Sequence, residues 1–262
     1  QQASTRNCEN MIGVVQVPVG VAGPLKIKTP SSSPLSGGEQ DYSLPDKGGL
    51  GRVFVPLATT EGALIASVSR GCKAITESGG ATVISKKIGI TRAPVFVVEN
   101  ILAGEKLINW GENNFQKLKE ITESTSSHLK LLDIKPFASG RNVFLRFRFD
   151  TQDAMGMNMA TIACSHAVDF IQKETGVNCT ALSGNMCVDK KPNLLNFIEG
   201  RGIQVKADVM IPKEIVASVL KTTPQKLAET AKRKLLYGSI LSGSIGANAH
   251  AANVIAAIFL AT

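Results

Sequence analysis

Hydrophobic and polar positions in the middle third of the chain change from a strand period to a helical period and back. Ala93–Glu99 is a β-branched run that predicts a strand, whereas Gly104–Leu129 is polar with apolar residues at nearly helical spacing. Leu131–Phe137 and Asn142–Phe149 are again strand-like, on either side of the turn at 138–141. This part of the chain therefore predicts a strand, a helix and a β-hairpin, in that order.

A second helix and a last strand follow. Asp153–Thr175 predicts a helix, Gly176 is a natural residue to end it, and Val177–Leu182 predicts a strand. The complete order is β-α-β-β-α-β, which is the split, ferredoxin-like unit.

The flanking segments predict the strands and helices of another domain. Extended segments or helix starts occur at Gly13–Lys28, Arg52–Leu57, Gln204–Met210, Pro212 and Pro224. Residues 29–52 are rich in Ser, Pro and Gly and predict a surface insertion. We therefore expect an α+β or α/β fold, with a larger α/β domain (1–92 and 183–262) that receives a ferredoxin-like domain (93–182).

Composition narrows the class of partner. The 262 residues include 29 Lys and Arg against 21 Asp and Glu, which gives a net charge of +8. This balance favours anionic partners, namely nucleic acid, an acidic membrane surface or phosphate-bearing small molecules; a basic surface without such a partner explains it equally well. The 5 cysteines are odd in number and form no C-x-x-C pair, which favours a reducing compartment over a disulfide framework or a zinc site.

The ends of the chain indicate a longer protein. Ala251–Ala261 is the most apolar segment, is too short to span a bilayer and predicts a buried helix. The chain lacks a signal-peptide pattern, begins without Met and stops inside this helical pattern. We therefore expect both ends to be cuts, which leaves an upstream membrane anchor open.

The segment Asp153-Ala154-Met155-Gly156-Met157-Asn158 stands where a strand pattern gives way to a helix pattern. Asp153 is well placed as an N-cap, and that structural role alone explains the aspartate. It does not explain Gly156 and Asn158, which are poor helix formers. A glycine at a helix N-terminus lets backbone N–H groups approach a dinucleotide pyrophosphate. No G-x-G-x-x-G follows a strand, so an ordinary Rossmann site is not predicted.

Two further motifs carry charge near a predicted helix. Glu61 lies just ahead of the helical run Ala63–Val68, where a glutamate commonly stabilises the helix dipole. Ser67, Arg70 and Lys73 follow at three-residue spacing and share one face of that helix. Such a face suits phosphate groups, and a solvated basic face explains the spacing nearly as well.

A third motif is Asp189-Lys190-Lys191-Pro192, after the last strand of the small domain. The proline stiffens the segment, and the acid can hold one ammonium in place. A positioned ammonium can stabilise the negative charge that develops on a thioester carbonyl oxygen as hydride arrives.

These motifs have companions that occur in a characteristic order: Glu9–Gly13, Pro18–Leu25, Thr59–Gly62, Ser183–Asn185 and His250–Asn253. The whole set resembles the catalytic portion of the NADPH-dependent 3-hydroxy-3-methylglutaryl-CoA (HMG-CoA) reductases, in a class I-like form. The resemblance runs from about Asn7 to Thr262, outside the stretch near 29–52. It implies reduction of HMG-CoA to mevalonate and CoA by two hydride transfers, in isoprenoid and sterol precursor synthesis. The cofactor implied is NADPH, two per turnover, without a metal.

The resemblance also implies roles for individual residues. Lys190 would stabilise the thioester oxygen, and a buried Glu61 would donate a proton to the aldehyde intermediate. Substrate contacts would come from Ser67, Arg70, Arg92, Ser183, Asp189, Lys191, Lys234, His250 and Asn253. Cofactor contacts would come from Ser126, Asp153, Met155, Gly156, Met157 and Asn158. For His250 a satisfied structural role is the alternative we favour. Ser126-Ser127-His128 matches a segment of the family that contacts the cofactor, but it lacks the basic and aromatic residues with which that segment usually ends. The choice between NADPH and NADH therefore stays open.

The resemblance implies a homodimer or higher homo-oligomer with a shared active site, in which Glu9–Gly13 contributes to the interface. It implies a cytosol-facing location, either cytoplasmic or in the catalytic domain of an ER-membrane-anchored protein. Membrane contact would come only through an upstream anchor, and nucleic acid is not an expected partner.

Two catalytic elements of the family are absent. The family has an aspartate in a Gly-Gln-Asp segment after the helix that here ends with Ala261-Thr262, and a histidine near its own C-terminus. We therefore expect these residues alone to be inactive, and an inactive, ligand-binding homologue stays an alternative.

An RNA-binding module is a further alternative. Gly140–Phe147 faintly echoes an RNP1 motif on a strand of the small domain. Strand alternation opposes it, because Val143, Leu145, Phe147 and Phe149 share one face. Phe144 is then the only aromatic beside Arg146 and Arg148, which is a poor platform for stacking bases.

Overall fold

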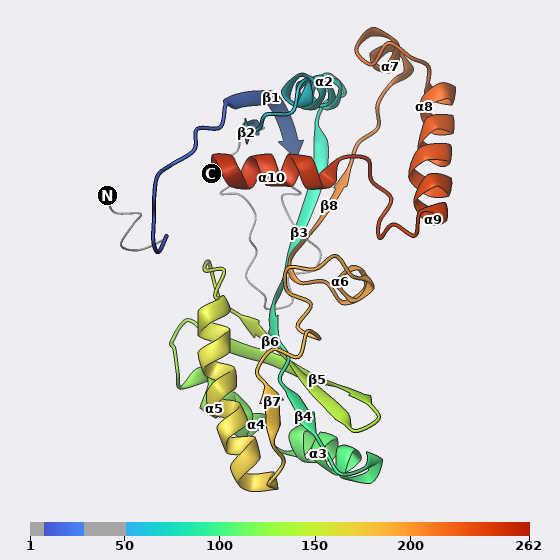
Figure 1. The fold of residues 1–262 in the computed structure, drawn as a ribbon. Coiled ribbons are helices and arrows are strands. Elements are labelled where there is room, and N and C mark those ends of the chain that lie inside the picture. Colours follow the sequence, from blue (N-terminus) through green and yellow to red (C-terminus); the bar gives the residue numbers. More distant parts are fainter. Residues whose placement is uncertain (1–7, 29–50) are drawn as a thin grey trace. The chain divides into compact units, whose positions relative to one another are not determined.

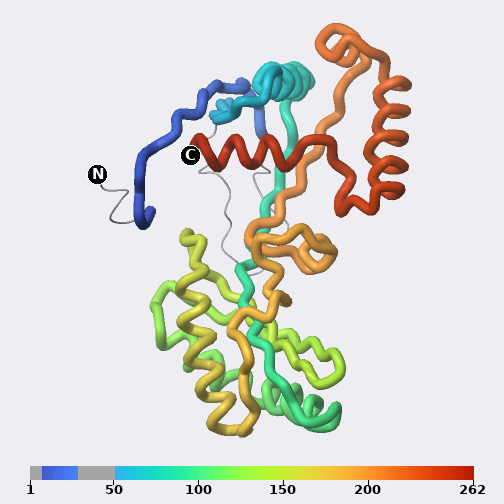
Figure 2. Tube along the Cα trace, viewed as in Figure 1, coloured from blue at the N-terminus to red at the C-terminus, as the bar shows by residue number. Residues whose placement is uncertain are grey.

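The computed structural model describes residues 8–28 and 51–262. The chain divides into two compact units (Figure 1). The described residues up to Ile84 and from Lys206 onward form the first unit, and Ser85–Val205 form the second. The chain passes between the units along β3 (Ala81–Arg92) and β8 (Gly202–Asp208), as the trace in Figure 2 shows. The small domain predicted from the sequence, residues 93–182, lies within this second unit, which extends further at both ends.

The second unit has the predicted element order, except that two helices replace the first one. The elements are β4 (Val95–Val97), α3 (Ile101–Asn113), α4 (Phe115–Glu123), β5 (Lys130–Ser139), β6 (Asn142–Asp150), α5 (Met157–Thr175) and β7 (Cys179–Ala181). The strands pair in the order β5-β6-β4-β7, and every pairing is antiparallel. The end of β3 also pairs with β6, with Ile90 opposite Phe149.

Local signals explain where the helices of this unit begin and end. The Oδ1 atom of Asn100 accepts a hydrogen bond from the N–H of Ala103, so α3 begins before the predicted Gly104. Asn114 ends α3 with φ −106°, and its side chain donates to the carbonyl of Trp110, which splits the single predicted helix. Gly176, with φ 70°, ends α5 as predicted.

The core of the second unit lies on one face of β6. The side chains of Val143, Leu145, Phe147 and Phe149 are buried there against α3, α4 and α5, which confirms the predicted alternation. Arg146 points to the other face, yet it is only 2 % exposed. That burial was not predicted, and it removes Arg146 from any surface that could bind RNA.

The first unit is built on a β-hairpin. β1 (Val19–Lys28) pairs antiparallel with β2 (Gly51–Ala58), and the start of β3 pairs parallel with the end of β1. The helices α2 (Leu64–Glu77) and α10 (Ala251–Ala261) pack on this hairpin. Their small core contains Ala22, Leu57, Leu64 and Ala257.

The prediction that Ala251–Ala261 forms a buried helix was wrong in one respect. The segment is a helix, but Ala257 is its only buried residue. Val254 and Ile258 pack beside Ala257, whereas Ile255 and Phe259 are exposed because they lie on the opposite side of the helix. Among the described residues, no helix is long and apolar enough to cross a membrane.

The remaining helices are α6 (Leu194–Glu199) in the second unit, and α7 (Lys213–Ser218), α8 (Pro224–Thr230), the π-helix η1 (Ala231–Gly238) and α9 (Ser239–Leu241) in the first. Of these, α7 and α8 begin at or just after the predicted Pro212 and Pro224. Thr223 caps α8 through its hydroxyl, with Pro224 in the first helical position.

Candidate functional site

The loop that follows β7 is held in an unusual backbone conformation. Asn185, Val188 and Lys190 all have positive φ, at 65°, 50° and 56°. Such conformations cost roughly 1–3 kcal/mol each and persist only where the surroundings fix them, most clearly for a β-branched valine. Gly184 fits because a Cβ there would lie 2.8 Å from the Cβ of Val95. This loop carries Ser183, Asp189, Lys190 and Lys191, all of which the sequence selected.

Hydrogen bonds to neighbouring elements fix the loop. The hydroxyl of Thr91, on β3, donates to the carbonyl of Cys187 at 2.6 Å. The Nδ2 atom of Asn196, on α6, donates to the carbonyl of Val188 at 3.2 Å. The carboxylate of Asp189 forms an ion pair of 3.1 Å with Arg201. The loop is therefore built into the unit rather than lying loosely on its surface.

The expectation that Asp189 holds a neighbouring ammonium was wrong. Its carboxylate pairs with Arg201, and Lys191 contacts only its backbone carbonyl, at 3.4 Å. Lys190 is exposed, and its ammonium makes no hydrogen bond or ion pair within the described part of the chain. The backbone, rather than an acid, sets where Lys190 points.

Arg92, at the end of β3, lies close to this loop. Its Nε atom is buried and makes no hydrogen bond with any described residue. The Cys187 thiol is 3.1 Å from the hydroxyl of Ser183. Burial raises the pKa of Cys187, but Ser183, the N–H of Asp189 and the charge of Arg92 together outweigh it, so the pKa lies below its usual value. The positive charge of Arg92 thus acts on the loop of Ser183.

The start of α5 differs from the prediction in two ways. The helix begins at Met157 with Gly156 before it, so the exposed Asp153 is not the N-cap. Gly156 has φ 70°, and a Cβ there would lie 2.4 Å from the Cβ of Thr151. Only glycine fits this position, because the residue directly before the helix has a left-handed backbone conformation and no space for a Cβ. The side chain of Met157 is buried in the core, whereas Met155 and Asn158 are exposed.

The structure brings the Ser126 segment to the start of α5. The hydroxyl of Ser126 is 3.3 Å from the sulfur of Met159, and Nδ1 of His128 is 3.0 Å from Oε1 of Gln152. Two segments that the sequence assigned separately to a cofactor are therefore neighbours.

In the first unit, Glu61 is linked to the C-terminal helix. The Nδ2 atom of Asn253, on α10, donates to Oε2 of Glu61 at 2.7 Å, and the backbone N–H of Glu61 donates to the hydroxyl of Thr59. Glu61 lies in the turn before α2 rather than in its first turn, and it is exposed rather than buried as the resemblance implies. The turn carries it away from the small core of this unit.

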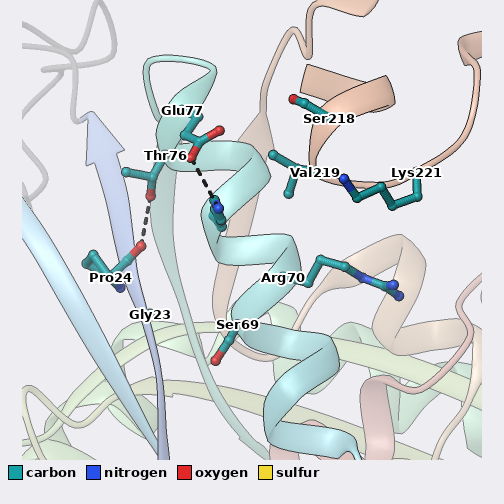
Figure 3. Close-up of a pocket in the computed structure, with 10 residues that line it drawn as sticks. Gly23, Pro24, Ser69, Arg70, Thr76, Glu77, Ser218, Val219 and Lys221 are labelled. Carbon is teal, nitrogen blue, oxygen red and sulfur yellow. Dashed lines mark hydrogen bonds and ion pairs between the residues drawn. The ribbon is translucent and has the colours of Figure 1, made fainter. Parts of the chain in front are cut away.

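A pocket of about 610 Å³ lies beside α2 in the same unit (Figure 3). Arg70 and Lys73 line it from α2, and Lys221 lines it from the segment after α7. Glu77 is the one acid among the described residues of the lining, and its Oε1 atom lies 3.7 Å from Nζ of Lys73. Because cations outnumber acids, the pocket suits an anion. Ser67, from the same predicted face, is exposed on α2 and does not line it.

The last two predicted residues are simply exposed. Lys234 lies on η1, and His250 directly precedes α10, where its side chain forms no cap. The preferred interpretation of His250 as a satisfied structural residue is therefore not supported by a contact among the described residues.

Sequence reasoning missed Arg201 and Lys221. Arg201 stands between Gly200 and Gly202, just before a predicted strand. A charged residue between two glycines is a pattern that could have marked it as a candidate site residue. Lys221 looks like an ordinary surface lysine in the sequence, and only the fold brings it to the pocket.

Comparison with known proteins identifies the family. A sequence model described as hydroxymethylglutaryl-coenzyme A reductase matches residues 1–262. The chain belongs to this family. It is 49 % identical over 261 residues to the 3-hydroxy-3-methylglutaryl-coenzyme A reductase of Haloferax volcanii, covering 100 % of this chain and 60 % of that protein. For the reductase of Methanothermobacter thermautotrophicus, the identity is 48 % over 263 residues, with 100 % and 62 % covered. The motif-based recognition of HMG-CoA reductases, an oxidoreductase family, is thus confirmed.

Solved structures support the fold. A 3-hydroxy-3-methylglutaryl-coenzyme A reductase of Streptococcus pneumoniae superposes with a TM-score of 0.68 at 13 % identity, covering 100 % of this chain and 63 % of that one. A class II reductase from the same organism, bound to NADPH in open conformations, gives a TM-score of 0.64 at 13 % identity, with 92 % and 56 % covered. The mixed α/β fold class is confirmed. The chain spans about 60 % of the length of the HMG-CoA reductases from Haloferax and Methanothermobacter.

Proposed function

We propose that the protein carrying this chain reduces HMG-CoA to mevalonate and CoA, with NADPH as reductant. One observation carries the proposal beyond family membership. Arg201 contacts both Asp189, in the loop of Lys190, and Met157, the first residue of α5. A site for a hydride donor at the start of α5 would therefore lie beside the lysine that stabilises the reacting oxygen.

The start of α5 fits a dinucleotide. The Gly156 position leaves no room for a Cβ, and the first backbone N–H groups of a helix attract an anionic pyrophosphate. Ser126 and the exposed Asp153, Met155 and Asn158 surround this end. NADPH bound there would supply the hydride, twice per mevalonate. Ser126-Ser127-His128 contains no lysine or arginine that would pair with the 2′-phosphate of NADPH.

Lys190 and Glu61 have different roles in the reaction: one stabilises negative charge and the other donates a proton. The Lys190 ammonium stabilises the oxyanion that forms when hydride reaches the thioester carbon, and again at the aldehyde. Glu61, held by Asn253, donates the proton that turns the second oxyanion into the alcohol. Arg92, Ser183, Asp189 and Lys191 hold the carboxylate and hydroxyl of the substrate. CoA leaves as the thiolate when the hemithioacetal oxyanion collapses to the aldehyde, and the resemblance assigns the proton that it then takes up to the histidine near the family's C-terminus.

The pocket beside α2 provides a place for CoA. Arg70, Lys73 and Lys221 are cations in one cavity, and CoA carries phosphate groups. Lys234 and His250 contribute contacts elsewhere in the first unit, and Ser67 contributes from the exposed face of α2.

We further propose a homodimer, at least, in which Lys190 and Glu61 of one site come from different chains. Ile12, Val14 and Val15 near the N-terminus are almost fully exposed, and such apolar side chains favour burial against a second copy. All 5 cysteines are free thiols, which supports a reducing, cytosol-facing location.

The test is product stoichiometry in the complete protein that carries these residues. We expect two NADPH consumed for each mevalonate formed from HMG-CoA, and loss of both signals in Lys190→Ala. NADPH and CoA binding without mevalonate would instead favour the inactive, ligand-binding homologue.

A further inference from the structure

We propose that Arg201 is a positioning residue for this reaction, a role that rests on the function proposed above. Its guanidinium fixes the loop of Lys190 relative to β3 and to the start of α5. Arg201 does not touch the reacting atoms in this scheme; it acts through Asp189 and Thr91.

Three contacts of Arg201 reach three separate elements. Its Nη2 atom lies 3.1 Å from Oδ1 of Asp189 and 3.1 Å from the sulfur of Met157. Its Nε atom donates to the hydroxyl of Thr91 at 3.1 Å. The side chains of Arg201 and Asp189 are each 18 % exposed, so water screens their ion pair only in part. One side chain therefore connects the lysine loop, β3 and α5.

Thr91 extends this connection to a second point on the loop. It is fully buried, and its hydroxyl accepts from Arg201 while donating to the carbonyl of Cys187 at 2.6 Å. The loop is thus held at Cys187 and at Asp189, the residue before Lys190. Because Lys190 itself has a positive φ of 56°, its direction depends on these flanking attachments.

Lysine could not replace this arginine. The guanidinium presents five donors in a planar fork, so it can reach Asp189 and Thr91 with different nitrogens. A lysine has a single nitrogen on a flexible stem, so it cannot hold Asp189 and Thr91 from two fixed positions as Nη2 and Nε of Arg201 do. The variant Arg201→Lys therefore keeps the charge and removes the geometry.

The experiment compares Arg201→Lys with Lys190→Ala and with Arg141→Lys in the complete protein. Arg141 lies at the β5–β6 turn, and its Nε atom donates to the carbonyl of Val98 at 2.8 Å, its one guanidinium bond to a described residue. We expect Arg201→Lys to lower kcat about 10²-fold, the scale of a 1 Å misplacement, with NADPH and CoA dissociation constants within a few fold. Arg141→Lys should leave kcat unchanged.

A double-mutant cycle separates positioning from general stability. If Arg201 acts through Asp189, then Arg201→Lys should lower kcat much less in an Asp189→Asn background than in the wild type. Thr91→Val, which keeps the volume of Thr91 but removes both hydrogen bonds, should lower kcat in the same direction. Additive effects in the cycle, or equal losses of kcat and melting temperature in Arg201→Lys and Arg141→Lys, would overturn the inference.

The outcome also distinguishes this inference from the proposed function. Normal kcat in Arg201→Lys beside an inactive Lys190→Ala overturns only the role of Arg201. Full activity in Lys190→Ala overturns the proposed function, and with it the reason to position that lysine.

Discussion

Asn253 donates a hydrogen bond of 2.7 Å from its Nδ2 atom to Oε2 of Glu61, a residue 192 positions earlier in the chain. The bond joins the first turns of α10 to the turn before α2 within the first unit. Both side chains are exposed, so the contact contributes direction to Glu61 rather than stability to the fold.

Replacing Asn253 should therefore change catalysis more than folding. Asn253→Ala frees the Glu61 carboxylate, and we expect kcat to fall roughly tenfold or more with little change in melting temperature. Asn248→Ala is the control, because Asn248 bonds the N–H of Ala251 at the start of the same helix. A melting shift without a kcat change is expected there. If Asn253→Ala turns over normally, Glu61 does not depend on this bond.

Lys190→Ala should abolish thioester reduction while CoA binding stays within a few fold. The ammonium acts mainly on developing charge, and loss of one such group typically costs ~10²–10³ in kcat. Lys213→Ala, at a highly exposed lysine of α7, should be neutral. Single-turnover rates with HMG-CoA decide the matter, and a drop below about tenfold would remove Lys190 from the mechanism.

Gly156 and Gly176 form a matched pair at the two ends of α5. Both have φ 70°, but a Cβ would clash with Thr151 only at Gly156, and it would meet nothing within 4 Å at Gly176. Gly176→Ala should lower the unfolding free energy by about 1–2 kcal/mol, the cost of a left-handed residue, without affecting NADPH. Gly156→Ala should cost more and weaken NADPH far more than CoA.

Urea unfolding and fluorescence titration test this pair. An unchanged NADPH affinity in a folded Gly156→Ala protein would exclude the start of α5 as the cofactor site. Equal weakening of NADPH and CoA would indicate unfolding in place of a local effect.

Periodicity predicted the second unit well because its core is regular. The alternation at Val143, Leu145, Phe147 and Phe149 and the glycine after α5 are local signals, and the structure follows both. The start of α5 could not be placed, because the left-handed Gly156 takes the capping position from Asp153. The burial of Arg146 also escaped prediction, because a charged residue on the face of β6 away from the core is expected to be exposed.

The sequence predicted which residues form the candidate site, but it did not predict which of them contact one another. Motifs identified the loop of Lys190, but the partner of Asp189 is Arg201, which is brought there by the fold. Local sequence could not reveal that pairing, because the acid had two lysines as nearer neighbours along the chain. The same holds for Lys221, whose approach to α2 depends on the packing of α7.

The ion pair between Asp150 and Lys87 predicts a pH-dependent stability of the second unit. Burial raises the pKa of Asp150, but hydrogen bonds from Lys87 and the N–H of Gln152, with the charge of Lys87, lower it below the value of 3.8 of a free aspartate. A lowered folded-state pKa stabilises the fold above the unfolded pKa, and that contribution is lost as pH falls through the folded pKa. The stability difference between wild type and Asp150→Asn should therefore be constant at neutral pH and shrink below about pH 4. Urea midpoints along a pH series measure it, and a difference that grows on acidification would contradict the assignment.

The exposed N-terminal segment gives the strongest test of assembly. Ile12 is fully exposed and Val14 and Val15 nearly so, in a stretch without regular secondary structure. We expect Met11→Asp/Ile12→Asp to convert the proposed homodimer to monomers, because charges at an apolar interface oppose its burial. Met210→Asp is the control, because Met210 is apolar and 85 % exposed but lies in another segment.

Activity of those monomers then tests the shared site. If Lys190 and Glu61 of one site come from different chains, folded monomers should be inactive, and mixing Lys190→Ala with Glu61→Gln dimers should restore part of the activity after subunit exchange. That recovery follows because one of the two sites in a mixed dimer then holds both intact residues. Sedimentation, circular dichroism and the rate assay are needed on the same samples. A folded, fully active monomer would show that each chain carries a complete site.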